Sequence, residues 1–124
     1  MAVFAIDYSG SIDYDLAFKA AEAIEKVGDQ GDQAITFDHQ IVGVDSASNA
    51  RSLINNSGGG GSSLQAVMDW ANGHGHKNVT VYTDGQFWTG NLKTYDLRVC
   101  VILMGEEDNI NENCGLPVVG RLIK

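Results

Sequence analysis

The feature that most restricts the fold is a set of short predicted strands that have no polar, solvent-exposed face. Residues 2–6 (AVFAI) and 98–104 (RVCVILM) carry apolar side chains on almost every successive position, whereas a half-exposed strand alternates apolar and polar residues. Residues 78–83 (NVTVYT) are interpreted as a further strand of this kind. Such strands occur in parallel sheets that helices cover on both sides. The sequence therefore predicts an α/β fold.

Two helices are expected between these strands. Apolar residues recur at helical spacing from residue 13 to residue 27, with Asp13 as a cap and Gly28 as a stop. A second helix follows the glycine run at 58–61, with Ser62 or Ser63 as its cap. We expect the glycine run to be a loop inside one domain that spans residues 1–124.

The remaining segments complete the predicted fold. Residues 33–37 (QAITF) and 40–44 (QIVGV) are expected to form an antiparallel hairpin around Asp38 and His39. Residues 46–56 are expected to hold a short helix, and residues 116–123 a short strand or helix. The predicted architecture is a doubly wound, mostly parallel sheet with one antiparallel edge strand, Rossmann-like, in three α/β/α layers.

Composition restricts the partners. Sixteen acidic residues against eight basic ones give a formal charge of −8, which disfavours binding to nucleic acids and to anionic membranes. The N-terminus lacks the pattern of a signal peptide, and no apolar run is long enough to cross a bilayer. We expect a cytoplasmic protein. Cys100 is expected to be a buried thiol because it lies in the apolar run VCVILM, and Cys114 a loop thiol because its surroundings are polar, rather than the two forming a disulfide. The chain has no Cys-x-x-Cys motif.

Two of the predicted strands end in an aspartate. Residues 2–6 run into Asp7, and residues 78–83 run into Asp84. In an open parallel sheet, ligands bind beyond the carboxyl ends of the strands, where the winding direction reverses. If the two strands are neighbours there, the two carboxylates converge and repel each other unless a cation lies between them.

Hydroxyl groups near these aspartates complete an all-oxygen donor set. Ser9 and Ser11 alternate with Asp7 along the turn, and the loop after the glycine run offers Ser62 or Ser63. Hydroxyl and carboxylate oxygens suit Mg²⁺, as well as Mn²⁺ or Ca²⁺, and suit zinc poorly. The sequence predicts a magnesium site.

These residues resemble a known motif. Asp7-x-Ser9-x-Ser11, the glycine loop with its hydroxyl, and Thr-Asp-Gly at 83–85 are similar, in order and separation, to the metal-ion-dependent adhesion site (MIDAS) of von Willebrand factor A (vWA) domains. The resemblance implies that Ser9 and Ser11 touch the metal, and that Asp7 and Asp84 hold it directly or through water. Ser62 would stand in the place of the family's threonine.

A nearer resemblance is to the vWA-like domain of metallopeptidase-like proteins from bacteria and phages, which have a similar glycine loop, TDG turn and terminal GLPVVGRLI-like stretch. The peptidase half is absent, because the chain has no His-Glu-x-x-His motif. The resemblance implies a phage or bacterial source. If the protein is encoded by a phage, the expected location is the host cytoplasm.

The function predicted from the resemblance is metal-dependent protein–protein interaction, in which an acidic residue of the partner completes the metal shell. By family analogy that partner is an AAA+ ATPase of the MoxR type. Phe87 and Trp88 follow the TDG turn directly, and are candidates for contact with the partner or for packing beneath the loop. His74 and His76 are expected to be solvated loop residues.

An Mg²⁺-dependent hydrolase similar to the haloacid-dehalogenase-like phosphatases is the alternative. Those enzymes have an Asp-x-Asp motif at the first turn, whereas this chain has Ser9 at the second of these positions. They also need a lysine to hold the phosphate, and the first lysine near the carboxyl end of a predicted strand is Lys93. No P-loop lysine and no G-x-S-x-G elbow is present. We therefore expect a binding module rather than an enzyme.

Overall fold

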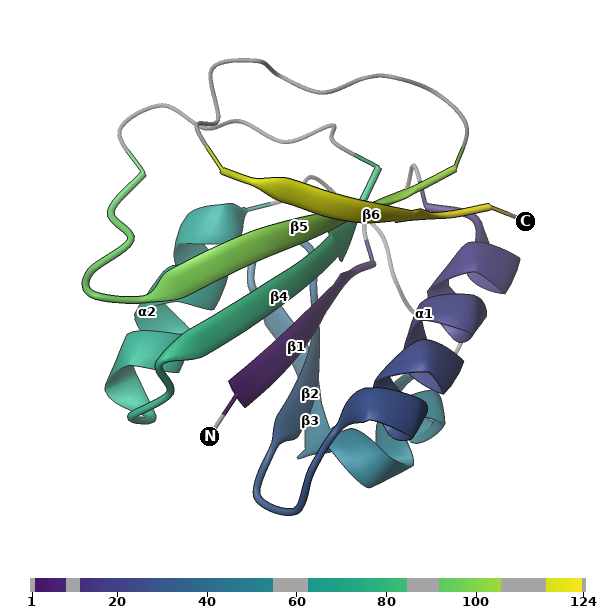
Figure 1. The fold of residues 1–124 in the computed structure, drawn as a ribbon, viewed down its shortest axis with the longest axis horizontal. Coiled ribbons are helices and arrows are strands. Elements are labelled where there is room, and N and C mark those ends of the chain that lie inside the picture. Colours follow the sequence, from purple (N-terminus) through teal and green to yellow (C-terminus); the bar gives the residue numbers. More distant parts are fainter. Residues whose placement is uncertain (1, 9–11, 55–62, 85–91, 106–115, 124) are drawn as a thin grey trace.

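The computed structural model describes residues 2–8, 12–54, 63–84, 92–105 and 116–123. They form one six-stranded sheet with the strand order β3-β2-β1-β4-β5-β6 (Figure 1). The elements, in chain order, are β1 (Ala2–Asp7), α1 (Tyr14–Val27), β2 (Gln33–Phe37), β3 (Ile41–Ser46), the 3₁₀ helix η1 (Ala47–Leu53), α2 (Leu64–Gly73), β4 (Asn78–Thr83), β5 (Arg98–Met104) and β6 (Val118–Leu122).

The predicted topology is confirmed. All neighbouring strands are parallel except β2 and β3, which form an antiparallel hairpin at one edge of the sheet. The chain starts in the middle with β1, builds outward through β2 and β3, and then returns to place β4 on the other side of β1. The winding direction therefore reverses between β1 and β4, where ligands bind in open α/β sheets.

The two α-helices begin at the residues that the sequence indicates. The Asp13 side chain accepts a hydrogen bond from Asp15 N at 2.8 Å and caps α1, which ends where Gly28 N donates to Ile24 O at 2.8 Å. Gly28 is required for packing, because a Cβ there would lie 2.5 Å from Ala47 Cβ of η1. Ser63, rather than Ser62, caps α2, with Ala66 N donating to Ser63 Oγ at 3.3 Å.

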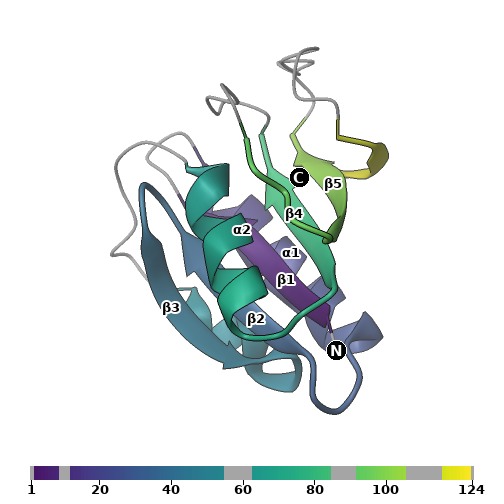
Figure 2. The ribbon, with the colours of Figure 1, turned by 90° about the vertical axis from the view of Figure 1, so that its left-hand side faces the viewer.

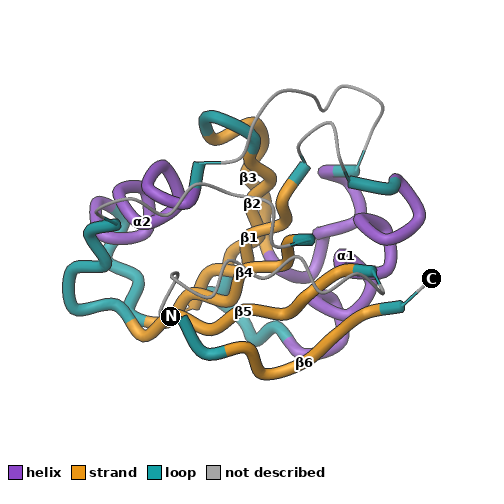
Figure 3. Tube along the Cα trace, turned by 90° about the horizontal axis from the view of Figure 1, so that it is seen from above, coloured by secondary structure: helices purple, strands orange, loops and turns teal. Residues whose placement is uncertain are grey.

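The helices lie on opposite faces of the sheet, with α2 on one side and α1 with η1 on the other (Figures 2 and 3). Each face has its own apolar cluster. Ile6, Tyr82 and Met104 pack on the α1 side with Leu16 and Ile24, whereas odd-numbered strand residues such as Val81 pack on the α2 side. The three-layer α/β/α arrangement follows from this alternation.

Some local predictions need correction. The second hairpin strand runs from Ile41 to Ser46, two residues beyond the predicted end. The C-terminal segment forms a strand, which is one of the two predicted alternatives. His76 is buried rather than solvated: its Nε2 lies 2.8 Å from Gln33 Oε1, and its ring stacks on Trp70 with 5.6 Å between centroids. Cys100 is half-buried rather than buried.

Candidate metal centre

The candidate site lies at the edge of the sheet formed by the carboxyl ends of the parallel strands, which we call the carboxyl edge. Strands β1 and β4 are hydrogen-bonded neighbours with Ile6 opposite Tyr82, so that Asp7 and Thr83 end the two strands side by side. Thr83 Oγ1 donates a hydrogen bond to Asp7 Oδ2 at 2.6 Å. Both side chains are fully buried. The structure therefore fixes a carboxylate at the reversal point of the sheet.

Asp84 follows Thr83 directly. It is half-buried and leaves β4 at the same edge as Asp7. The predicted convergence of the two strand ends is thus present, and both predicted aspartates lie at this edge. Thr83 was part of the TDG motif but was not expected to contact Asp7. The signal that could have revealed it is alternation, since Val81 and Thr83 share the face on which Val3 and Asp7 point.

Burial makes the Asp7 carboxylate costly. Moving a charge from water into a protein interior is unfavourable unless hydrogen bonds or an opposite charge compensate for the loss of hydration. The Thr83 hydroxyl offsets part of this cost by donating a hydrogen bond to Asp7 Oδ2. A cation bound beside Asp7 and Asp84 would stabilise the carboxylates further.

The start of α2, which follows the glycine run in the sequence, lies at the same edge. Ser63 N donates to Asp38 O at 2.8 Å, which joins the start of α2 to the end of β2. Strands β1 and β2 are paired up to Asp7 and Phe37, so the N-terminus of α2 lies near the candidate site. The Ser63 hydroxyl caps this helix.

The remaining predicted site residues lie outside the described part of the chain. These are Ser9, Ser11 and Ser62 of the metal set, and Phe87 and Trp88 of the expected partner contact. Their described neighbours are placed: Tyr8 N donates to Phe37 O at 2.7 Å, which keeps the chain at the carboxyl edge as it leaves β1. The acidic run at 106–108 and Cys114 also lie outside the described residues.

Asp38 is a buried acid at this edge with a structural role. Its Oδ1 accepts a hydrogen bond from Gln40 N at 3.1 Å and lies 3.2 Å from His39 Nδ1. These bonds close the tight turn between β2 and β3, as predicted for Asp38 and His39.

The segment that returns from Asp84 to β5 is anchored on α2. Lys93 N donates to Gln65 Oε1 at 2.8 Å, and Gln65 Nε2 donates to Lys93 O at 3.1 Å. Tyr95 donates its hydroxyl proton to Asp69 Oδ1 at 2.8 Å, which raises the pKa of Tyr95. Tyr95 has a positive φ of 54°, a conformation that the surrounding contacts must stabilise.

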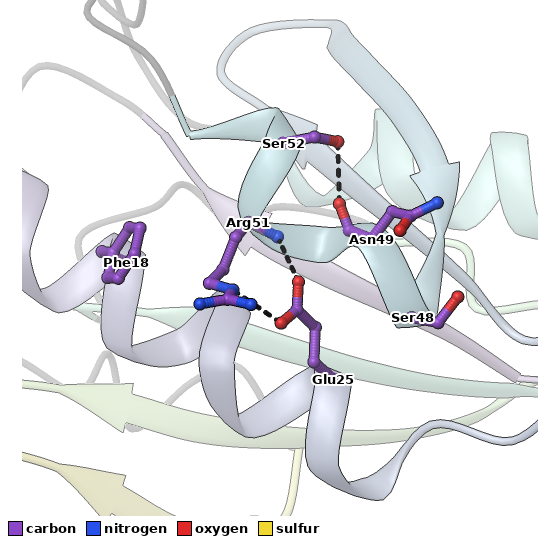
Figure 4. A pocket seen from close by; sticks show the side chains of 6 residues that line it. All are labelled: Phe18, Glu25, Ser48, Asn49, Arg51 and Ser52. Carbon is purple, nitrogen blue, oxygen red and sulfur yellow. Dashed lines mark hydrogen bonds and ion pairs between the residues drawn. The ribbon is translucent and has the colours of Figure 1, made fainter.

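A separate groove lies between α1 and η1, away from the carboxyl edge. It has a volume of about 400 Å³ and is lined by Phe18, Glu25, Ser48, Asn49, Arg51 and Ser52 (Figure 4). Glu25 holds Arg51 through Nε at 2.7 Å and through the backbone N at 2.9 Å. These bonds tie η1 to α1, so we interpret the groove as a structural junction.

Among the described residues, no three or more His, Cys, Asp or Glu side chains gather to form a metal site. A soft or imidazole-rich site is therefore absent from that part of the chain. In the same part, no helix has the length and apolar character needed to span a membrane.

Comparison with known families agrees with the topology. A sequence model described as VWA-like domain (DUF2201) matches residues 2–124. The chain belongs to this family. The six-stranded sheet, its antiparallel edge strand and its flanking helices are those of a vWA-like α/β domain. No curated protein matches the sequence. Membership of the VWA-like family does not favour the phosphatase alternative.

Proposed function

We propose that this VWA-like domain is a metal-ion-dependent protein-interaction module with a MIDAS-type site. Asp7, Ser9, Ser11, Ser62 and Asp84 are the proposed ligands. The observation that carries the proposal is the buried Asp7 carboxylate at the reversal point between β1 and β4, held by Thr83 at 2.6 Å with Asp84 next in the chain. Strand ends in this arrangement are where an α/β sheet binds its ligand.

The donor set fits a hard divalent cation. The described members, Asp7 and Asp84, are carboxylates, and the three serines would add hydroxyl oxygens. Oxygen ligands of this kind suit Mg²⁺, with Mn²⁺ and Ca²⁺ as chemical neighbours. When bound, the cation would supply a positive charge and a coordination position for a carboxylate from outside.

Other residues of the chain would orient the ligands and hold the segments that carry them. Thr83 orients Asp7 through its hydrogen bond, and Asp84 extends the donor set beyond the last strand residue. The anchor between Gln65 and Lys93 holds the far end of the segment that begins at Asp84. A preformed donor set lowers the entropy cost of binding.

The proposed partner is another protein that presents a glutamate or aspartate. A chain of charge −8 repels an acidic partner, so a cation between the two carboxylates would make the contact dependent on the metal. Phe87 and Trp88 are proposed to contact that partner, and a MoxR-type AAA+ ATPase is the proposed class. A cytoplasmic location, the host cytoplasm for a phage protein, fits this assignment.

We do not propose catalysis. Ser9 stands where the phosphatases have a second aspartate. Lys93, the first lysine in the chain near the carboxyl end of a strand, places its Nζ 4.6 Å from the centre of the Tyr95 ring and is exposed. That position favours a structural contact for Lys93 over a phosphate contact.

Thermal unfolding tests the proposal. At a free Mg²⁺ concentration one hundred times Kd, the wild type should gain about 2.7 kcal/mol over the protein in chelator, by mass action. Asp7→Asn should abolish the gain. Asp38→Asn removes a charge at the same edge from a side chain engaged in a turn, and should keep it. An equal Mg²⁺ response in Asp7→Asn and wild type would reject the site.

The interaction itself needs a second measurement. Proteins retained from cell extract by the wild type in Mg²⁺ should be lost both in chelator and with Ser9→Ala. An acidic-to-amide substitution in the recovered partner should then remove its binding. Retention that ignores the metal would contradict the proposed mode.

A further inference from the structure

The contact between Asp7 and Thr83 engages one particular oxygen of the Asp7 carboxylate. Thr83 Oγ1 donates its proton to Asp7 Oδ2 at 2.6 Å, and both side chains are fully buried. An O–H···O bond of this length is at the short end of the range found in proteins. The fold therefore gives Oδ2 of Asp7 a defined hydrogen-bond donor.

Strand geometry holds the Thr83 hydroxyl in this position. Asp7 and Thr83 end the paired strands β1 and β4, one residue beyond the pair of Ile6 and Tyr82. Side chains alternate along a strand, so Thr83 lies on the same face as Val81, which packs on the α2 side. Because threonine is branched at Cβ and this one is buried, its hydroxyl has few other orientations. The strand pairing thus fixes the bond to Oδ2.

This bond limits how a cation can approach Asp7. The hydroxyl proton points at Oδ2 and carries a partial positive charge, which repels a cation placed beside the same oxygen. An ion coordinated by both carboxylate oxygens would have to share Oδ2 with that proton. We therefore expect Asp7 to meet the metal, or a water bound to the metal, through a single oxygen.

Mg²⁺ and Ca²⁺ respond differently to such a carboxylate. Mg²⁺ takes about six ligands in a near-ideal octahedron and keeps several of its waters, which suits contacts through one oxygen. Ca²⁺ takes roughly six to eight oxygens in a flexible arrangement, and gains a ligand when a carboxylate binds through both oxygens. The proposed donor set contains the carboxylates of Asp7 and Asp84. Restricting Asp7 to one oxygen removes a ligand from Ca²⁺ but none from Mg²⁺.

We propose that Thr83 makes the metal site selective for Mg²⁺ over Ca²⁺. Thr83 is a positioning residue, because it acts on the ion through Asp7. This inference rests on the proposed function, and adds to it the choice of ion and the residue that makes the choice. Mn²⁺, which also occupies octahedral oxygen sites, should behave like Mg²⁺.

Titration calorimetry on the whole chain tests the proposal. It gives the Kd of Mg²⁺, Mn²⁺ and Ca²⁺ for the wild type, Thr83→Val and Thr83→Ser. Thr83→Val keeps the shape of the side chain and removes the hydroxyl, whereas Thr83→Ser keeps a hydroxyl at the same position. Thr80→Val makes the same change on the opposite face of β4 and is the matched control. Chemical denaturation in chelator gives the stability of each variant.

The wild type should bind Mg²⁺ and Mn²⁺ more tightly than Ca²⁺. Removing a hydrogen-bond partner of a metal ligand typically lowers the affinity for the metal by about tenfold or more. Thr83→Val should therefore lose about tenfold for Mg²⁺ and Mn²⁺ and keep its affinity for Ca²⁺, so that the preference for Mg²⁺ falls about tenfold. Thr83→Ser should retain most of the preference, and Thr80→Val all of it. A loss of stability alone would weaken every ion alike and leave the preference unchanged.

Two results would overturn selection by Thr83 and leave the proposed metal site intact. One is a wild type that binds Ca²⁺ as tightly as Mg²⁺. The other is a Thr83→Val variant that loses the same factor for both ions, which would mean that Thr83 supports Asp7 without selecting the ion. If Thr83→Val does not fold, the wild-type preference and Thr83→Ala decide in the same way. A wild type that binds none of the three ions would reject the proposed site, and this inference with it.

Discussion

The two edges of the sheet treat buried polar groups differently. At the carboxyl edge, Asp7 is buried with the Thr83 hydroxyl at 2.6 Å. At the amino edge, His76 is buried with the Gln33 amide oxygen 2.8 Å from its Nε2 and the Trp70 ring stacked on it. The second pair can be satisfied without any charge. The first buries a carboxylate, and a bound cation would lower the cost of that burial.

This difference separates a structural polar contact from a functional one. Both are strand-end pairs, and both join segments far apart in the sequence. Only the carboxyl edge lies at the reversal point of the sheet and carries a further acid, Asp84. Substitutions at the amino edge should therefore change stability alone, and those at the carboxyl edge should change the response to metal.

The largest effect is expected for His76→Ala. The substitution leaves a cavity beneath Trp70 and removes the partner of Gln33, and should lower the free energy of unfolding by about 3 kcal/mol. Chemical denaturation in chelator measures the loss. The stabilisation by Mg²⁺ should stay as in the wild type. A variant that also lost its metal response would break the distinction between the edges.

Thr83→Val should have the next largest effect. It keeps the shape of the side chain but removes the hydrogen bond to a charged group, worth about 1.5 to 3 kcal/mol. We expect weaker Mg²⁺ binding by roughly tenfold or more, which corresponds to about 1.4 kcal/mol. Titration calorimetry measures the change. Thr80→Val, on the opposite face of β4 from Thr83, is the control and should bind Mg²⁺ normally.

Thr36→Val sharpens the comparison from the opposite direction. Thr36 Oγ1 is buried and has no hydrogen-bond partner among the described residues. Replacing this hydroxyl by a methyl group should stabilise the protein by about 1 kcal/mol, because an unsatisfied polar group is removed. A higher denaturation midpoint with an unchanged slope would confirm the expectation. A loss of stability would show that the hydroxyl is satisfied in solution.

The smallest effect concerns pH. The Ser52 hydroxyl, followed by the Ser46 backbone, lowers the pKa of Asp45. A lowered pKa in the folded state gives stability that is present above the unfolded pKa of about 4 and is lost as the pH falls through the folded value. Ser52→Ala should therefore be slightly less stable than wild type at pH 6, and the difference should vanish at acidic pH. A difference that persists there would come from the bond of Ser52 to Asn49 O instead.

Local pattern was sufficient for most of the fold. The strands at 33–37 and 78–83, the cap at Asp13 and the hairpin at Asp38 each depend on neighbours in the sequence, and each is where the pattern indicates. His76 was misjudged because its partner Gln33 is 43 residues away and the local sequence HGHK resembles a loop. Cys100 was expected to be buried because its strand is apolar, whereas its exposure depends on segments distant in the sequence.

For the candidate site, the sequence was sufficient to predict which two strand ends form it. Asp7 and Asp84 lie at the same edge of the sheet because strand order and register place the ends of β1 and β4 side by side, and the sequence motifs mark both residues. The bond between Thr83 and Asp7 was not predicted, since it depends on the register between two strands that are separated by 76 residues.

The most direct test replaces Mg²⁺ by paramagnetic Mn²⁺ and follows the backbone amide signals by NMR. A cation held between the ends of β1 and β4 should broaden the signals of Tyr8, Ser63 and Asp84 at substoichiometric Mn²⁺ and spare His76 and Gln33 at the opposite edge. Excess Mg²⁺ should restore the broadened signals. Broadening spread evenly over the acidic surface, or absent at Tyr8 and Asp84, would contradict the proposed metal centre.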